Sequence, residues 1–110
     1  MNQAETAKLS ELLEQWNDAD EFSRCIEALE AIPEQERGYF LTVKLSRAYS
    51  NLAVLGEHRA HGTDGAVDGA LIRHAIDLLE SVCTQGEHDP YWHARMGYSC
   101  LMAYPSAATA

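Results

Sequence analysis

Histidine and carboxylate side chains are the groups in this sequence whose chemistry could bind a metal. His58 and His61 lie three residues apart with Asp64 close by, and His88 precedes His93 by five positions. Zinc sites use such ligands, but these spacings match no strong zinc motif, and a glycine-rich segment would not hold the first group rigidly. We therefore expect no metal site and no cofactor.

Catalysis would need a nucleophile or an acid–base pair in a recognisable setting. The sequence contains neither GxSxG nor a phosphate-binding glycine motif. Ser46, Ser50 and Ser99 fall in helical patterns, where small residues pack or lie at the surface. Paired acids such as Asp18 and Glu21 fit helix capping better than acid–base work, which requires a desolvated cleft. We expect a binding protein and no enzyme.

The three cysteines, Cys25, Cys83 and Cys100, favour a reducing compartment. They are odd in number, far apart and outside CxxC spacing, so they predict neither a disulfide framework nor a zinc motif. Each lies among apolar residues at helical spacing, and we expect each to be a small buried side chain.

Acidic residues dominate the first third of the chain. Residues 1–36 hold ten acids against Lys8 and Arg24, whereas residues 37–110 hold seven acids against six bases, for a net charge of −9. Nucleic acids and anionic membranes bind clustered Lys and Arg, so we expect neither as a partner. Two interpretations remain: a solvated helix face that aids solubility, or a docking surface for a basic partner.

No apolar run approaches the roughly 20 residues that span a bilayer. The first residues, MNQAETAKLSELLEQW, are acidic, whereas a signal peptide is basic and then continuously apolar. We expect a cytoplasmic protein.

Apolar residues recur at helical spacing along most of the chain, which predicts one all-α domain over residues 1–110. Residues 17–20 supply turn and N-cap chemistry, Pro33 breaks a helix, and Gly86 suits the left-handed position after one. Asp89 and Pro90 fit the start of the last helix. The predicted helices cover residues 4–16, 19–31, 35–56, 70–83 and 91–103, and the glycine-rich segment 56–69 is predicted to be a loop.

The pattern of small and bulky positions repeats between pairs of helices. The residues that carry it are Leu9, Leu12, Leu13 and Trp16 with Cys25, Leu29 and Ile32; Leu45, Ser46 and Tyr49 with Ala75, Leu79 and Val82; and Asp89, Pro90, Trp92, Met96, Gly97 and Cys100. This pattern resembles the tetratricopeptide-repeat (TPR) family, which stacks antiparallel helix pairs into a solenoid. The chain departs from the family pattern in the 56–69 insertion and in Trp92, which comes one step early.

The resemblance implies a protein-interaction module that binds a protein or peptide through a shallow face lined by the first helix of each pair. Lys44, Arg47, Asn51 and Arg95 lie on such helices and are the candidate partner-binding residues. Ordinary solvated helix residues would show the same pattern. The alternative function is a small acidic regulatory or toxin-neutralising protein that binds a basic partner through its N-terminal third.

The third repeat lacks a second helix, because only SAATA follows Tyr104 and Pro105. Solenoid ends normally need a polar cap. The helix at 91–103 would then belong to a shortened chain, be covered by the folded-back tail, or pair with a second copy. Self-association would use the apolar side chains near this end, namely Tyr91, Met96, Leu101, Met102 and Tyr104.

Overall fold

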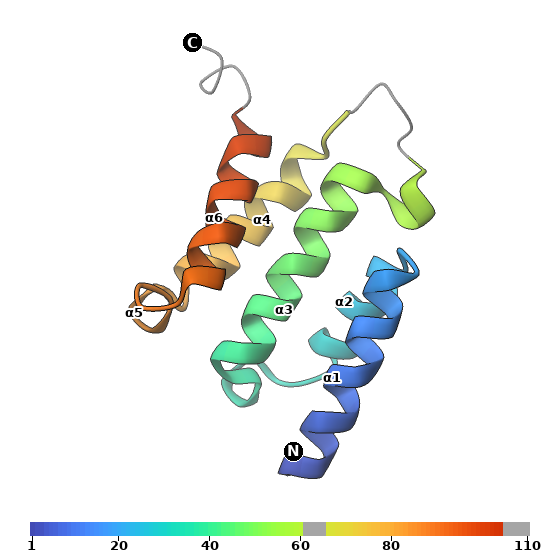
Figure 1. Cartoon of the computed structure of the whole chain (residues 1–110), viewed down its shortest axis with the longest axis vertical. Coiled ribbons are helices and arrows are strands. Elements are labelled where there is room, and N and C mark those ends of the chain that lie inside the picture. The colour runs from blue at the N-terminus through green and yellow to red at the C-terminus, as the bar shows by residue number, and fades with distance from the viewer. Residues whose placement is uncertain (61–65, 105–110) are drawn as a thin grey trace.

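The computed structural model describes residues 1–60 and 66–104, and this part of the chain consists of helices and the turns that join them, with no strand (Figure 1). Its helices are α1 Gln3–Asp18, α2 Phe22–Glu30, α3 Glu34–Leu55, the 3-10 turn η1 Glu57–Arg59, α4 Gly69–Glu80, α5 Cys83–Gly86 and α6 Pro90–Ala103. The five long helices confirm the predicted ones to within a few residues at each end. The single turn of α5 was not predicted.

The helices form two layers. Helices α1, α3 and α6 lie in the layer nearer the viewer in Figure 1, and α2 and α4 lie behind them. Consecutive long helices run in opposite directions, and α3 packs against both α2 and α4 while α6 packs against α4. None of the helices in the described ranges 1–60 and 66–104 is long and apolar enough to cross a membrane.

Short polar side chains start three of the helices. Asn2 and Glu5 form a reciprocal capping box, in which each side chain accepts a hydrogen bond from the other's backbone N–H. Asp68 caps α4 by accepting from two backbone N–H groups. Asp89 caps α6 by accepting from the N–H of Tyr91, and Pro90 occupies the first turn, as the sequence predicted.

Two hydrophobic clusters fill the space between the layers. The first core cluster joins α1, α2 and α3, and the second joins α3, α4 and α6. Helix α3 therefore contributes side chains to both. The buried members are Leu13, Cys25, Leu29, Leu41, Leu45 and Ala48 in the first core cluster, and Val43, Leu79 and Trp92 in the second.

Helix α2 starts differently from the prediction. Glu21 occupies its N-cap without a capping side-chain bond, and Asp20 has a left-handed backbone with φ of 58°. The cap comes instead from η1, where Glu57 Oε1 accepts from the N–H of Ser23 at 2.8 Å. We call residues 57–59 the 57–59 clip, because they also bind Asp20 twice. The N–H of His58 donates to the Asp20 carbonyl at 2.9 Å, and Arg59 pairs with its carboxylate at 2.8 Å.

Helix α3 is kinked rather than continuous. Gly38 has φ of 71° and ψ of 179°, a conformation outside the helical region that residues with a Cβ rarely adopt. Its carbonyl accepts a hydrogen bond from the Thr42 hydroxyl at 2.7 Å. The helix predicted over residues 35–56 is therefore interrupted close to its start.

Gly86 lies at the end of α5, and its role differs from the predicted one. It is buried and does not belong to the positive-φ residues of the described chain. A Cβ at this position would lie 2.3 Å from Cγ of Trp92. The glycine is needed because the indole ring packs directly on its backbone, while Nε1 of Trp92 donates to the Leu79 carbonyl at 2.9 Å.

The cysteines differ in exposure. Cys25 is buried, and burial raises the pKa of its thiol to about 11. Cys100 is partly buried, with its thiol 3.7 Å from the Met96 sulfur. Cys83 is exposed at the start of α5, so the prediction of a buried side chain is wrong there. The break between α4 and α5 explains this, because it turns Cys83 out of the apolar stripe of α4.

Candidate functional site

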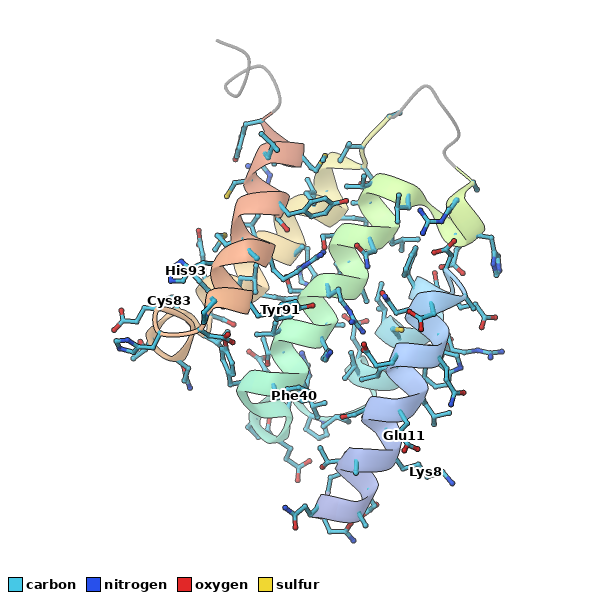
Figure 2. The ribbon with its side chains drawn as sticks, in the orientation of Figure 1. Lys8, Glu11, Phe40, Cys83, Tyr91 and His93 are labelled. Carbon is cyan, nitrogen blue, oxygen red and sulfur yellow. The ribbon has the colours of Figure 1, made fainter. Side chains whose placement is uncertain are left out.

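Two large aromatic side chains lie exposed on the layer formed by α1, α3 and α6. Phe40 at the start of α3 is 50% exposed, and Tyr91 at the start of α6 is 42% exposed. The ammonium group of Lys44 lies 5.2 Å from the ring centroid of Phe40 and 5.9 Å from that of Tyr91. We call these three residues the aromatic–lysine cluster. Figure 2 shows both rings on the face turned toward the viewer.

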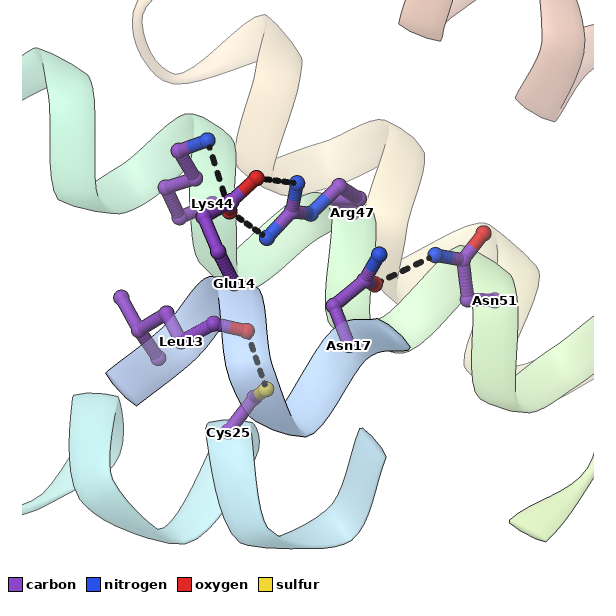
Figure 3. A network of polar contacts seen from close by, with 7 residues as sticks. All are labelled: Leu13, Glu14, Asn17, Cys25, Lys44, Arg47 and Asn51. Carbon is purple, nitrogen blue, oxygen red and sulfur yellow. Dashed lines mark hydrogen bonds and ion pairs between the residues drawn. The ribbon is translucent and has the colours of Figure 1, made fainter. Parts of the chain in front are cut away.

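Glu14 on α1 binds two basic side chains of α3: Lys44, which belongs to the aromatic–lysine cluster, and Arg47 beside it (Figure 3). Glu14 accepts from Lys44 at 3.2 Å and from both terminal nitrogens of Arg47, at 3.2 and 2.5 Å. A bidentate bond between a guanidinium and a carboxylate is strong and fixes the orientation of both groups. The Glu14 side chain is 51% exposed, whereas that of Arg47 is 10% exposed, so the carboxylate faces the surface and the cation lies beneath it.

The electrostatics of this ion pair favour the charged forms. The hydrogen bond from Arg47 is the main cause that lowers the pKa of Glu14 from 4.5 to about 2. Burial opposes this bond, and the charge of Arg47 and the bond and charge of Lys44 add to it. Burial lowers the pKa of Arg47, but the bond and charge of Glu14 outweigh it, so the pKa is raised overall. The Glu14 carboxylate is therefore ionised at any pH above the acid range.

Arg95 links α6 to α3 through polar contacts. Its guanidinium donates to Ser50 Oγ and to the Asn51 side-chain oxygen, and lies 4.8 Å over the ring of Tyr98. Asn51 in turn donates to Asn17 on α1 at 2.9 Å. Within residues 1–60 and 66–104 no ion pair forms to Arg95, and its buried Nε has no hydrogen-bond partner. Burial lowers the pKa of Arg95, because the charged form is partly desolvated.

The structure thus places all four sequence-predicted site residues in one layer, where they link its three helices. Lys44, Asn51 and Arg95 are partly buried. Arg47 is only 8% exposed, so the expectation that it would be free for solvent or a partner is wrong. Its partner on α1 lies 33 positions away in the sequence, and helical spacing alone could not show that contact.

Sequence reasoning did not place the two exposed rings of this face among the partner-binding residues, because it left Phe40 out and assigned Tyr91 to the self-association surface. Phe40 follows Tyr39 and precedes Leu41, and three consecutive residues of a helix cannot all point to one side. The same argument applies to Tyr91 beside the buried Trp92. Neither Phe40 nor Tyr91 falls on the buried apolar side of its helix. This departure from the helical spacing was the feature of the sequence that could have indicated their exposure.

A hydrogen bond fixes the position of Tyr91. The Tyr39 hydroxyl, near the kink of α3, donates to the same Asp89 carboxylate that caps α6. Burial and this bond raise the pKa of Tyr39 to about 12, and the bond lowers the pKa of Asp89. The start of α6 is therefore tied to the start of α3, and the aromatic–lysine cluster is held from both helices.

The rest of the described surface offers fewer groups that could bind a ligand. A groove of about 470 Å³ lies near the kink and is lined by Gly38, Tyr39, Thr42 and Val82 among others. Within residues 1–60 and 66–104 there is no group of three His, Cys, Asp or Glu side chains that could hold a metal. Of the histidine group considered above, His61 and Asp64 lie outside the described residues.

The chain was compared with known proteins both by sequence and by fold. No protein-family model and no curated protein matches the sequence, and no solved structure matches the fold.

Proposed function

We propose that the protein is an interaction module with a TPR-like helical array, and that its α1–α3–α6 face binds a protein or peptide partner. The observation that carries this proposal is the aromatic–lysine cluster, in which two exposed rings flank a cation at 5.2 and 5.9 Å. Aromatic residues are enriched at the energetic centres of protein interfaces, because they bury a large apolar area at a low cost in entropy.

Fixed side chains around the cluster support a binding role. Lys44 is held by Glu14, and Tyr91 follows the Asp89 cap that Tyr39 also binds. A side chain that is already ordered loses little freedom when a partner binds. The cluster therefore offers both contact area and preorganisation, and we infer binding rather than catalysis as the activity of this face.

The packing between the layers supports the TPR-like arrangement. Ser46 is 1% exposed, and its hydroxyl donates to the Ala75 carbonyl on α4 at 2.7 Å. A small residue at this position lets α3 and α4 approach closely, which is the role that the repeat pattern gives to it. In this arrangement α1 and α3 would open two helix pairs and α6 would open a third unit, and the three helices lie in one layer (Figure 1).

The experiment that tests this function is photo-crosslinking from the cluster. A photoreactive phenylalanine analogue in place of Phe40 or Tyr91 should crosslink to one partner in the source cell, and the same analogue in place of exposed Thr84 should not. With the partner in hand, the double variant Phe40→Ala/Tyr91→Ala should weaken binding at least about tenfold. Unchanged affinity of that variant would refute the proposal.

The second candidate is the acidic regulatory or toxin-neutralising protein, and one observation favours it. Of the ten acids in residues 1–36, eight have exposed side chains: Glu5, Glu11, Glu14, Asp18, Glu27, Glu30, Glu34 and Glu36. A basic partner would then bind with a steep dependence on salt. The triple variant Glu11→Gln/Asp18→Asn/Glu27→Gln should abolish binding in this case, and Phe40→Ala/Tyr91→Ala should leave it intact.

A further inference from the structure

The side of α6 that faces away from the other helices carries an uncharged stripe. Its residues follow one another at steps of four, three, four and three, which keeps them on one side of the helix. We call it the outer seam of α6. All five members are exposed: Pro90, Ala94, Gly97, Leu101 and Tyr104. Leu101 and Tyr104 are each 50% exposed, so the seam is an apolar surface that nothing in the described chain covers.

The seam is distinct from the face proposed above. The buried side of α6 holds Trp92 and Ser99, half a turn away from Leu101. Tyr91 lies on a third side, toward α3, where it takes part in the aromatic–lysine cluster. A molecule that covered the outer seam would therefore leave the α1–α3–α6 face accessible.

We propose that the outer seam of α6 pairs with the same seam of a second copy of this chain, in an antiparallel, two-fold contact. The first argument is the order of side-chain sizes. The N-terminal half of the seam is small, with Ala94 and Gly97, and the C-terminal half is large, with Leu101 and Tyr104. In an antiparallel pair each Leu101 lies over the Gly97 of the other copy, so a large side chain meets a small one twice.

Gly97 is open toward solvent and can receive that side chain. A Cβ built on it would meet no atom of its own chain within 4 Å among the described residues. A parallel pair would instead place large against large and leave a gap where the two glycines meet. The order of small and large side chains therefore favours the antiparallel orientation. It also favours a second copy as the partner, because in that orientation the small half of each seam meets the large half of the other.

The second argument is charge. Two copies that each carry a net charge of −9 repel one another over most of their surfaces. Ten of the 17 acids lie in residues 1–36, which comprise α1, α2 and the first residues of α3, whereas α6 contains no acid. Helix α6 lies at the opposite side of the molecule from α1 (Figure 1), so pairing there keeps the acidic parts apart.

Such a dimer presents two α1–α3–α6 faces. A partner with two binding segments would then bind with higher avidity than either segment alone, without any new contact. The pairing itself rests only on the seam, so it stands or falls separately from the proposed function of the other face.

Light scattering of the untagged full chain over a range of concentrations tests the pairing. We expect the mass to rise from 12.2 kDa toward twice that value at high micromolar concentration. Leu101→Glu should keep the mass of one chain at every concentration, because in a dimer each copy would bury one unpaired charge in the contact. Ala4→Glu adds the same charge at an exposed position of α1 and should dimerise like the wild type. Far-UV circular dichroism should show equal helicity for all three proteins.

Gly97→Leu tests the orientation. It fills the small half of the seam, so it should weaken an antiparallel dimer at least about tenfold, whereas it would strengthen a parallel one. The replacement favours helix, and no atom of the described chain crowds it, so the fold is retained. A wild-type mass of one chain at high micromolar concentration, a dimeric Leu101→Glu variant, or a tighter Gly97→Leu dimer would each overturn the proposal.

Discussion

Glu14 is the side chain on which the buried cations of the α1–α3–α6 face depend. Its carboxylate is half exposed, yet it is the only carboxylate within the described chain that pairs with Arg47. Without it, a guanidinium that is 10% exposed would lie beside Arg95 with no opposite charge. The ion pair between α1 and α3 therefore stabilises both the fold and the electrostatics of the proposed binding face.

The pH dependence of stability tests this role. The folded-state pKa of Glu14 is lowered from 4.5 to about 2, so its contribution is complete above pH 4.5 and is lost as the pH falls toward 2. Glu14→Gln should lower the free energy of unfolding at neutral pH by about 1–2 kcal/mol, a value kept small because water screens a half-exposed carboxylate. It should also flatten the decline below pH 4.5. Glu11→Gln is the control, and equal acid sensitivity of both variants would contradict the assignment.

Gly86 is a second residue whose identity the packing dictates. Gly86→Ala would force a methyl group against the Trp92 ring, 2.3 Å from its nearest atom. We expect a loss of about 1–3 kcal/mol in the free energy of unfolding, measured by urea denaturation. Gly69→Ala, where an added Cβ meets nothing within 4 Å, should change stability by no more than about 1 kcal/mol. Similar losses in both variants would show that the ring can move aside.

At the scale of elements, the 57–59 clip replaces the local cap that α2 lacks. Glu57 reaches back 34 positions to bind the N–H of Ser23, and the backbone of His58 binds Asp20. His58 and Arg59 both have left-handed backbone conformations, with φ of 50° and 57°. This costs conformational energy, which the bonds to the α1–α2 turn offset.

Removal of the clip should weaken the first turn of α2. Glu57→Ala leaves the N–H of Ser23 without its acceptor, and we expect a loss of about 1 kcal/mol, the usual effect of a missing N-cap. Amide exchange should accelerate at Ser23 and in the following turn. Glu80→Ala removes an exposed acid at the end of α4 and should leave these amides unchanged. Unaltered exchange at Ser23 in the Glu57→Ala variant would show that water replaces the cap.

The elements were largely predictable because they rest on local chemistry. Apolar spacing, Pro33 and the Asp89–Pro90 pair gave the five long helices. The kink at Gly38, the turn of α5 and the clip were not predictable, because each depends on a contact or a backbone conformation that periodicity does not encode. The candidate site shows the same division, since Arg47 was identified as a site residue while its partner Glu14 was not.

At the scale of the whole molecule, α3 is the element that joins two partly separate cores. It supplies Leu45 to the first core cluster and Val43 to the second. The described part of the chain holds no direct packing between α2 and α6 of the kind that α3 makes with its neighbours. Because α3 is the main link between the two core clusters, we expect stability to be divided between them rather than shared equally by all helices.

Matched cavity variants on either side of α3 test this division. Leu29→Ala and Leu79→Ala both remove a leucine that is 0% exposed, and each should cost roughly 2–5 kcal/mol. By hydrogen exchange, Leu29→Ala should deprotect α1 and α2 more than α6, and Leu79→Ala should deprotect α4 and α6 more than α1. Equal deprotection of all helices in both variants would show that the two clusters unfold as one unit.

The placement of the two tryptophans provides optical probes for the two cores. Trp16 packs against the first core cluster, with the Arg24 guanidinium 5.6 Å from its ring, and Trp92 belongs to the second and is 9% exposed. The fluorescence of the partly exposed Trp16 should peak at a longer wavelength than that of the buried Trp92. Variants with a single tryptophan would therefore report the two ends of the molecule separately, without an added label.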